Sequence, residues 1–289
     1  MDASLLKKLK DMSGAGLMDC KKALEASNDN IEDAIAYLRE KGISKAAKKA
    51  DRIAVEGISN VIINGNDAVI YEVNCETDFV SANDKFKTLV NTIGEALINN
   101  DVHTIEDALK LSVGEETLND VIINTTATMG EKMDLRRFER ITKADSEVFG
   151  SYIHMGGKMS ALIVLEGGSE DVAKDIAMHA TAMMPSYIRR EEVPTDEVEK
   201  ETEILKIQAM NEGKPAEIAE KMVKGRINKF YKDICLEEQE FVKNSDVTVG
   251  EFAKQNNATI KTMVRFAVGE GMEKKEENFA EEVMKQIKG

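Results

Sequence analysis

The chain has 289 residues, 42% hydrophobic and 32% charged, so it is long enough to form more than one folded unit with a buried core. Its 39 basic and 53 acidic residues give a formal net charge of -14, which disfavours direct binding to nucleic acid or to an anionic membrane. The first residues do not form a basic and apolar signal sequence, and the longest apolar runs are too short to cross a bilayer, so we expect a soluble, cytoplasmic protein.

Residues 1–52 predict an N-terminal three-helix domain followed by a basic linker. Apolar residues recur at helical spacing in residues 5–12 and 31–38, and a short apolar helix is expected between them. Gly42 is expected to end the third helix, because glycine commonly follows the last residue of a helix. We interpret the basic side chains in residues 45–52 as a solvated linker rather than as a binding site.

Residues 53–145 predict a first α+β lobe. Apolar and polar residues alternate on both sides of the turn-forming segment 64–67, which is the pattern of a β-hairpin. A helix is expected from about residue 83 to residue 98, with Ser81 as a candidate N-cap. Further helical stretches then lead to a strand at residues 133–141.

Residues 146–271 repeat this order and predict a second α+β lobe. Two strands, at residues 150–154 and 161–165, surround a glycine turn, and a helix follows at 171–184. A strand at residues 260–268 completes the lobe. Two related lobes, each a small sheet covered by helices on one face, are the simplest structural meaning of this repeat.

Two helical segments complete the predicted architecture. An antiparallel helical hairpin is expected as an insertion at residues 195–231, because Gly213-Lys214-Pro215 separates two helical runs. Residues 272–289 predict a C-terminal helical module with an apolar stripe that includes Phe279. The fold class is therefore α+β, with a three-helix domain, a two-lobed core, an inserted helical hairpin and a C-terminal helical module.

The segment 75–80, CETDFV, places a phenylalanine beside an acid at the end of a strand and before a helix. One interpretation is structural: Phe79 packs inward onto the lobe, while Thr77 and Asp78 form a turn. The other is functional: the turn presents Phe79 to another protein as a rigid aromatic anchor. Pattern alone favours the structural interpretation.

Motifs for covalent or nucleotide chemistry are weak. The chain has neither the three-glycine dinucleotide loop nor a phosphate-binding GxxxxGK[ST] loop, and its histidines and cysteines do not occur at metal-ligand spacing. We therefore predict no cofactor and no metal site. A thiol site that combines Cys75, His154 and Asp78 is an alternative, but Cys75 alternates in phase with buried strand residues and is also explained as a small hydrophobe.

Several segments together resemble the elongation factor Ts family, the guanine-nucleotide exchange factors of elongation factor Tu. The two strongest matches are the N-terminal segment SGAGLMDCKKAL (residues 13–24) and the segment NCETDFV (residues 74–80). Landmarks further along the chain are GSYIH (150–154), AMHA (177–180), GKP (213–215) and RFAVGEG (265–271). The resemblance covers nearly the whole chain in order, and it implies a three-helix domain similar to ubiquitin-associated folds, a two-lobed core, an inserted coiled coil and a C-terminal helical module.

The resemblance implies a function without covalent chemistry, so we expect an exchange factor and not an enzyme. Its implied partner is elongation factor Tu, bound to GDP or free of nucleotide, and its implied binding element is the turn from Thr77 through Asp78 and Phe79 to Val80, which disturbs the partner's magnesium site. Met129, Gly130 and His154 are further candidate partner contacts. A homodimer and a heterotetramer with elongation factor Tu both stay open.

Two competing hypotheses belong to other functional classes. The first is an adaptor module built on residues 1–42, and the second is a thiol-dependent hydrolase centred on Cys75. Replacement of Cys75 by serine would abolish a hydrolase but spare an exchange factor, whereas replacement of Phe79 by alanine would do the reverse.

Overall fold

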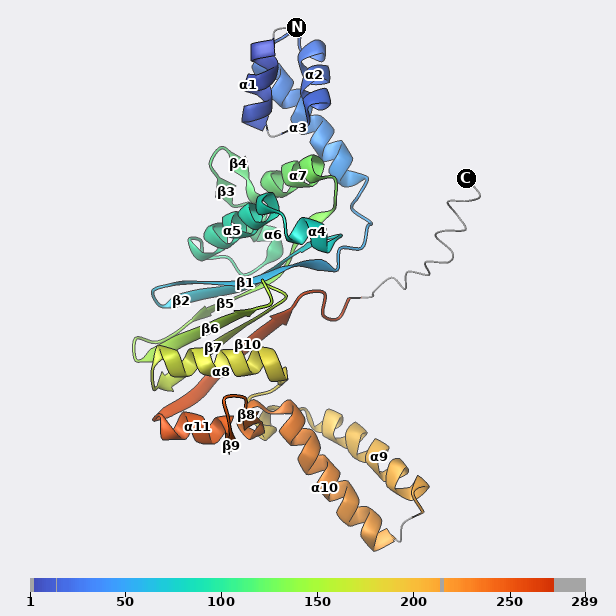
Figure 1. The fold of residues 1–289 in the computed structure, drawn as a ribbon, viewed down its shortest axis with the longest axis vertical. Helices are drawn as coiled ribbons and strands as arrows, with labels where there is room; N and C mark the ends of the chain where they lie inside the picture. Colours follow the sequence, from blue (N-terminus) through green and yellow to red (C-terminus); the bar gives the residue numbers. More distant parts are fainter. Residues whose placement is uncertain (1–2, 14, 214–215, 273–289) are drawn as a thin grey trace. The chain divides into compact units, whose positions relative to one another are not determined.

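The protein combines helices with small sheets, an α+β architecture, in a computed structural model that describes residues 3–13, 15–213 and 216–272 (Figure 1). It divides into two compact units that each combine distant parts of the chain. Unit 1 contains the described residues of Met1–Ser59, Tyr71–Glu139 and Ala267–Gly289, and unit 2 contains Asn60–Ile70 and Arg140–Phe266. The domain boundaries that we expect from the sequence stay a prediction.

The first three helices of unit 1 form a small bundle, as predicted. They are α1 (Ala3–Ser13), α2 (Leu17–Ala26) and α3 (Ile31–Ala47). Their core consists of small and medium apolar side chains, all fully buried: Leu9, Cys20, Ala23, Leu24 and Ala34. Asn30 starts α3 because its side chain accepts hydrogen bonds from the backbone N–H groups of Glu32 and Asp33.

Our prediction that Gly42 ends the third helix is wrong, because α3 continues to Ala47. Gly42 lies instead against α7 (Leu118–Met129), where a Cβ atom would be 3.4 Å from the Cβ of Ala127. The missing side chain therefore allows the two helices to approach closely. An ion pair of 2.6 Å between Arg39 and Asp120 joins the same two helices.

A three-stranded sheet with the strand order β1-β2-β5 follows the bundle. Its strands are β1 (Glu56–Asn64), β2 (Asp67–Cys75) and β5 (Met133–Thr142), so the hairpin and the strand after it are confirmed. The middle strand β2 is buried on both faces, from Ala68 to Cys75, and not on alternate residues only. On one side Tyr71 donates a hydrogen bond of 3.0 Å to the carbonyl of Val90 in α5 (Asp84–Ile98).

A buried ion network connects β2 and β5 with the last described segment of unit 1. The carboxylate of Glu72, which is fully buried, lies 2.9 Å from a guanidinium nitrogen of Arg136 and 2.6 Å from Nε of Arg137. The same carboxylate accepts a hydrogen bond of 2.8 Å from the N–H of Gly269, and Arg136 also donates to the carbonyl of Glu270. Two cations and a backbone donor thus compensate the burial of this negative charge.

The remaining elements of unit 1 are short. They are α4 (Asp78–Ser81), α6 (Ile105–Ala108), β3 (Ser112–Val113) and β4 (Glu116–Thr117). A capping box at Thr117 and Asp120 starts α7, and Gly130 ends it in the left-handed conformation.

Unit 2 contains a second three-stranded sheet with the order β10-β7-β6, which confirms the predicted strands. The strands are β6 (Glu147–His154), β7 (Met159–Gly167) and β10 (Ala258–Ala267), and α8 (Glu170–Met183) packs on them. Strands β6 and β7 are antiparallel, with His154 opposite Met159 across a turn of four residues. Gly150 lets α8 lie on β6, because a Cβ there would be 2.1 Å from the carbonyl carbon of Ala173.

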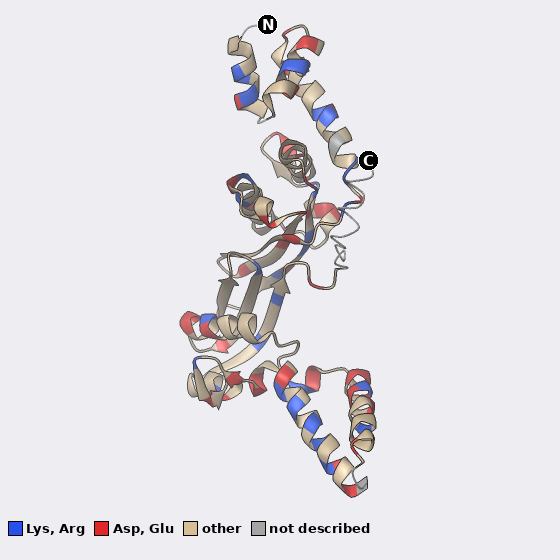
Figure 2. Ribbon diagram, turned by 45° about the vertical axis from the view of Figure 1, so that its right-hand side comes forward, with Lys and Arg blue, Asp and Glu red and all other residues tan. Residues whose placement is uncertain are grey.

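The predicted helical hairpin is also present in unit 2. Helices α9 (Thr195–Asn211) and α10 (Ala216–Ile234) lie side by side and bury Leu205, Ala209 and Val223 between them. Acidic residues predominate in α9 and basic residues in α10 (Figure 2), so the two helices have complementary charge. Short elements complete the unit: η1 (Arg190–Glu192), η2 (Leu236–Glu238), β8 (Glu240–Phe241), β9 (Asn244–Thr248) and α11 (Val249–Gln255).

Two further expectations concern membranes and the C-terminus. None of the helices in the described part of the chain is long and apolar enough to cross a membrane. The predicted C-terminal helical module at 272–289 lies, after Met272, outside the described residues.

A buried histidine makes unit 2 sensitive to acid. His179 on α8 is fully buried, with Nε2 2.9 Å from the side-chain oxygen of Gln239 and Nδ1 accepting a hydrogen bond of 3.1 Å from the N–H of Val242. Because Nδ1 is an acceptor, the ring is neutral and donates from Nε2. Burial lowers the pKa of His179, although the hydrogen bond to Gln239 partly opposes this effect.

We expect the free energy of unfolding to fall as the pH drops below about 6.5, the usual pKa of histidine, because the unfolded chain then binds a proton that folded His179 excludes. The contribution of one group is at most about 1.4 kcal/mol per pH unit. Urea unfolding between about pH 5 and pH 8 measures the slope of the free energy of unfolding against pH. It should become flatter in His179→Asn but not in His103→Gln, a change at an exposed histidine. Equal slopes in the two variants would contradict this account.

Candidate functional site: an exposed aromatic turn

Residues 77–80, which we call the exposed turn, carry the most exposed large hydrophobic side chain in the described part of the chain. Phe79 is 85% exposed and stands on α4, a helix of a single turn. Thr77 is the N-cap of this helix, and its hydroxyl accepts a hydrogen bond of 3.3 Å from the N–H of Val80. Asp78, the residue before Phe79, is also exposed, whereas Val80 is half-buried.

Two predictions for this segment are wrong. Phe79 does not pack inward onto the lobe, and Ser81 does not cap the following helix. Ser81 is the last residue of α4 and donates a hydrogen bond of 2.9 Å to the carbonyl of Asp78. Asn83 caps α5 instead, because the chain makes one extra helical turn before α5 begins. That extra turn directs Phe79 into solvent.

The exposed turn is held in place by hydrogen bonds to a carboxylate from another segment. Glu131 follows the glycine at the end of α7, and both of its oxygens bind the same residue of the exposed turn. Thr77 donates from its backbone N–H, at 3.0 Å, and from its hydroxyl, at 2.7 Å. The buried thiol of Cys75 donates a further hydrogen bond, of 3.2 Å, to the carbonyl of Thr77.

A second carboxylate, next to the exposed turn, binds the backbone of the segment that contains Glu131. Glu76, the residue before Thr77, accepts a hydrogen bond of 2.6 Å from the N–H of Lys132, the residue after Glu131. Each segment therefore supplies a carboxylate to the backbone of the other. We call this pair, Glu76 and Glu131, the carboxylate clamp.

Basic residues after α3 contact the same region. A guanidinium nitrogen of Arg52 lies 3.3 Å from the carboxylate of Glu76, and Lys49 donates a hydrogen bond to the carbonyl of Gly130. These residues remain partly or fully exposed, as a solvated linker requires, but Lys49 and Arg52 also make contacts that our interpretation did not include. The linker is thus attached to the two segments that the carboxylate clamp joins.

The structure brings some of the predicted contact residues together. The carboxylate clamp places Met129 and Gly130 next to the exposed turn, because Glu131 follows them directly. His154 belongs to unit 2, where it ends β6 and its ring stacks on Tyr152 with 6.0 Å between the ring centres. Its role as a partner contact stays a prediction.

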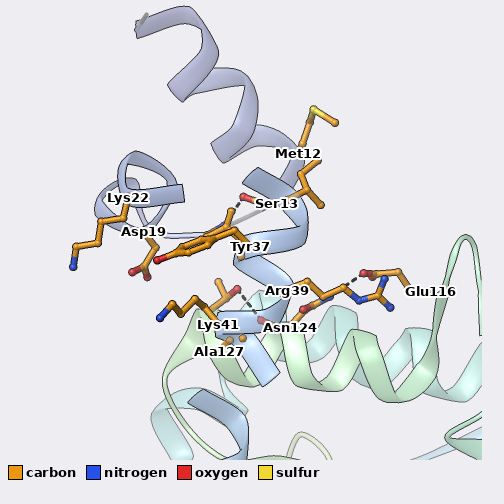
Figure 3. A pocket seen from close by; sticks show the side chains of 16 residues that line it. Met12, Ser13, Asp19, Lys22, Tyr37, Arg39, Lys41, Glu116, Asn124 and Ala127 are labelled. Carbon is orange, nitrogen blue, oxygen red and sulfur yellow. Dashed lines mark hydrogen bonds between the residues drawn. The ribbon is translucent and has the colours of Figure 1, made fainter. Parts of the chain in front are cut away.

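The segment 13–24 has a buried side and an exposed side. Cys20, Ala23 and Leu24 belong to the bundle core, whereas Leu17 and Met18 are 53% and 62% exposed. Other residues of the segment line a cavity of about 740 Å³ between the bundle and α7, together with Tyr37 and Asn124 (Figure 3). Acidic and basic side chains both line this cavity, so its charge does not select a ligand.

The geometry gives little support to thiol chemistry. Cys75 is fully buried in β2, and Cys235 is buried with its pKa raised to about 11, chiefly by desolvation, so Cys235 is a thiol at neutral pH. Among the described residues there is also no group of three histidine, cysteine, aspartate or glutamate side chains that could hold a metal ion.

The sequence comparison decides the family. The family model of elongation factor TS matches residues 76–270, which include the exposed turn, the carboxylate clamp, strand β5 of the first sheet and all three strands of the second sheet. The chain belongs to the elongation factor Ts family. The α+β fold, with N-terminal helices followed by a core, agrees with this membership. The elongation factor Ts family implies binding to elongation factor Tu and a role in translation elongation, as a nucleotide exchange factor that catalyses no covalent chemistry.

Because Phe79 is exposed, its removal should not affect the stability of the free protein. We expect Phe79→Ala to change the free energy of unfolding by less than about 0.5 kcal/mol. The matched control is Phe86→Ala in α5, which removes a fully buried ring and should cost about 3–5 kcal/mol. Denaturant unfolding measures both values. A large loss of stability in Phe79→Ala would show that the ring packs on its own chain.

Proposed function

We propose that this protein binds elongation factor Tu in its GDP complex and inserts the exposed turn to release GDP, so that GTP can bind. The observation that carries this proposal is the 85% exposure of Phe79 on a turn that hydrogen bonds to Glu131 hold in place. An aromatic ring kept in water gains free energy when a partner covers it, about 1.5–3 kcal/mol for a side chain of this size. A fixed turn also loses little conformational entropy on binding.

In the proposed mechanism, Phe79 enters an apolar gap between helices of the partner, close to its magnesium site. Asp78, which precedes Phe79 and is exposed, supports the rearrangement through polar contacts. Magnesium requires nearly octahedral oxygen ligands and links the nucleotide phosphates to the partner's own side chains. A small displacement of those ligands therefore weakens the binding of both the metal and GDP.

This mechanism needs neither a nucleotide site nor a covalent step on the exchange factor. It is also reversible, because coupling between two binding events is reciprocal. To the extent that this protein lowers the affinity of elongation factor Tu for GDP, bound nucleotide lowers the partner's affinity for this protein by the same factor. Incoming GTP consequently displaces the exchange factor, and the nucleotide-free complex is the tight one.

We assign further partner contacts to surfaces on both units. Met129 and Gly130 lie next to the exposed turn and would contact the partner with it, and we include His154 on unit 2 as a further contact. The exposed Leu17 and Met18 give the N-terminal bundle an apolar surface for the same partner. We place the complex in the cytoplasm, because bacterial translation elongation takes place there.

The first test is the release of fluorescent GDP from bacterial elongation factor Tu, followed by stopped flow. We expect the wild-type protein to accelerate release strongly and Phe79→Ala to lose most of that acceleration. The matched control is Ile63→Ala, which shortens an apolar side chain that is 42% exposed on β1. Cys75→Ser should retain exchange, because no thiol takes part.

Each outcome of this experiment has a distinct meaning. Acceleration that survives in Phe79→Ala would move the mechanism from the exposed turn to the wider interface. A folded wild-type protein that does not accelerate release would contradict the exchange function itself.

A further inference from the structure

The exposed turn is too short to hold its own conformation. Helix α4 has four residues, and isolated helices shorter than about 12 residues are marginal in water. The order of the exposed turn must therefore come from groups outside it. Glu131 is the outside group with the most direct contact, because both of its carboxylate oxygens accept hydrogen bonds from Thr77.

We propose that Glu131 is a positioning residue for nucleotide exchange, which holds Thr77 so that α4 presents Phe79 in the orientation that enters the partner. This inference rests on the proposed function of the exposed turn. Glu131 acts through Thr77 and has no assigned contact with the nucleotide or the metal.

The hydrogen bonds around Thr77 have a defined direction. The hydroxyl of Thr77 has one proton, which it donates to Glu131, so its lone pairs are left for the N–H of Val80. This N–H is one of the donors that the start of a helix leaves without an intrahelical partner. Glu131 thus orients the hydroxyl that closes the first turn of α4.

A carboxylate is the group that this geometry requires. Thr77 offers two donors, N–H and O–H, and an ionised carboxylate accepts at both of its oxygens. A glutamine at position 131 would accept at one atom only and would direct its NH₂ group toward a second donor. Hydrogen bonds to a charged acceptor are also about twice as strong as neutral ones.

The second half of the carboxylate clamp fixes the position of Glu131 itself. Glu76 binds the N–H of Lys132, and Arg52 lies against Glu76, so the residue after Glu131 is tied to the residue before Thr77. Gly130, with a φ of 85°, turns the chain sharply just before Glu131. The exposed turn and the C-terminal end of α7 therefore form one small rigid surface.

Loss of this positioning should affect the maximal rate of GDP release more than the half-saturating concentration of the exchange factor. The rest of the interface sets how much exchange factor is needed for half-maximal acceleration. The orientation of Phe79 sets how often a docked complex can proceed to GDP release. We therefore expect Glu131→Gln to lower the maximal release rate about tenfold, which corresponds to about 1.4 kcal/mol, and to change the half-saturating concentration by less than about twofold.

The first experiment uses the free protein and does not depend on the exchange function. Amide hydrogen exchange followed by NMR should be faster for Thr77 and Val80 in Glu131→Gln than in the wild type. The matched control is Glu115→Gln, the same chemical change at an exposed carboxylate in the β3–β4 turn, which should leave both amides unchanged. Unchanged protection of Thr77 and Val80 in Glu131→Gln would overturn the positioning role.

The second experiment measures GDP release from elongation factor Tu with single and double variants. Thr77→Val should lower the maximal rate as Glu131→Gln does, and the double variant should lose no more than either single one. Thr77→Ser keeps the hydroxyl and should therefore lose less of the maximal rate than Thr77→Val. In the Phe79→Ala background, Glu131→Gln should have no further effect, because it acts through the missing ring.

The outcomes separate this inference from the proposed function on which it rests. A wild type that does not accelerate release overturns the exchange function, while hydrogen exchange still decides whether Glu131 orders the turn. Full exchange activity in Glu131→Gln overturns the positioning role alone. So does a loss of maximal rate from Glu131→Gln that is as large in the Phe79→Ala background as in the wild type. Thermal unfolding of each variant confirms that the compared proteins are folded.

Discussion

The site depends on two carboxylates that are exchanged between neighbouring segments. Glu131 binds the backbone and hydroxyl of Thr77, and Glu76 binds the N–H of Lys132. These contacts use charged acceptors for backbone donors that a short turn cannot satisfy within itself. They allow Phe79 to remain in water on an ordered turn, at the expense of the apolar burial that the ring would gain by packing inward. Order and exposure at the same residue are what a binding element requires.

The fold could be predicted well wherever its signals are local. The turn residues at 64–67 and the alternation around them predict the β1–β2 hairpin, and the glycine–proline interruption near 213 predicts the α9–α10 hairpin. Errors arose where contacts between distant segments decide the structure. Gly42 carries the usual signal for a helix end, but close packing on α7 lets α3 continue through it. Strand β2 alternates in sequence yet is buried on both faces, because Ala68 and Ile70 pack against residues of the second sheet while Tyr71 packs against α5.

The position of the candidate site could be predicted from the sequence, but the orientation of Phe79 could not. Resemblance to a family points to the exposed turn, whereas the residue pattern alone favours a buried Phe79. The deciding feature is the extra helical turn capped by Thr77, and the capping hydroxyl is held by Glu131, 54 residues away in sequence. No local pattern in residues 75–80 contains that information. Glu131, Lys49 and Arg52 could be recognised only when folding placed them beside the turn, since each is an ordinary charged residue in its own segment.

The central claim is that Phe79 moves from water into an apolar site on elongation factor Tu when the nucleotide leaves. A single 4-fluorophenylalanine at position 79 tests this directly by ¹⁹F NMR, through the change in chemical shift between H₂O and D₂O. In the free protein the fluorine should show the full solvent isotope shift, because the ring is 85% exposed. In the nucleotide-free complex with elongation factor Tu we predict that this shift is almost lost. A fluorine that keeps its full solvent isotope shift in that complex would contradict the account.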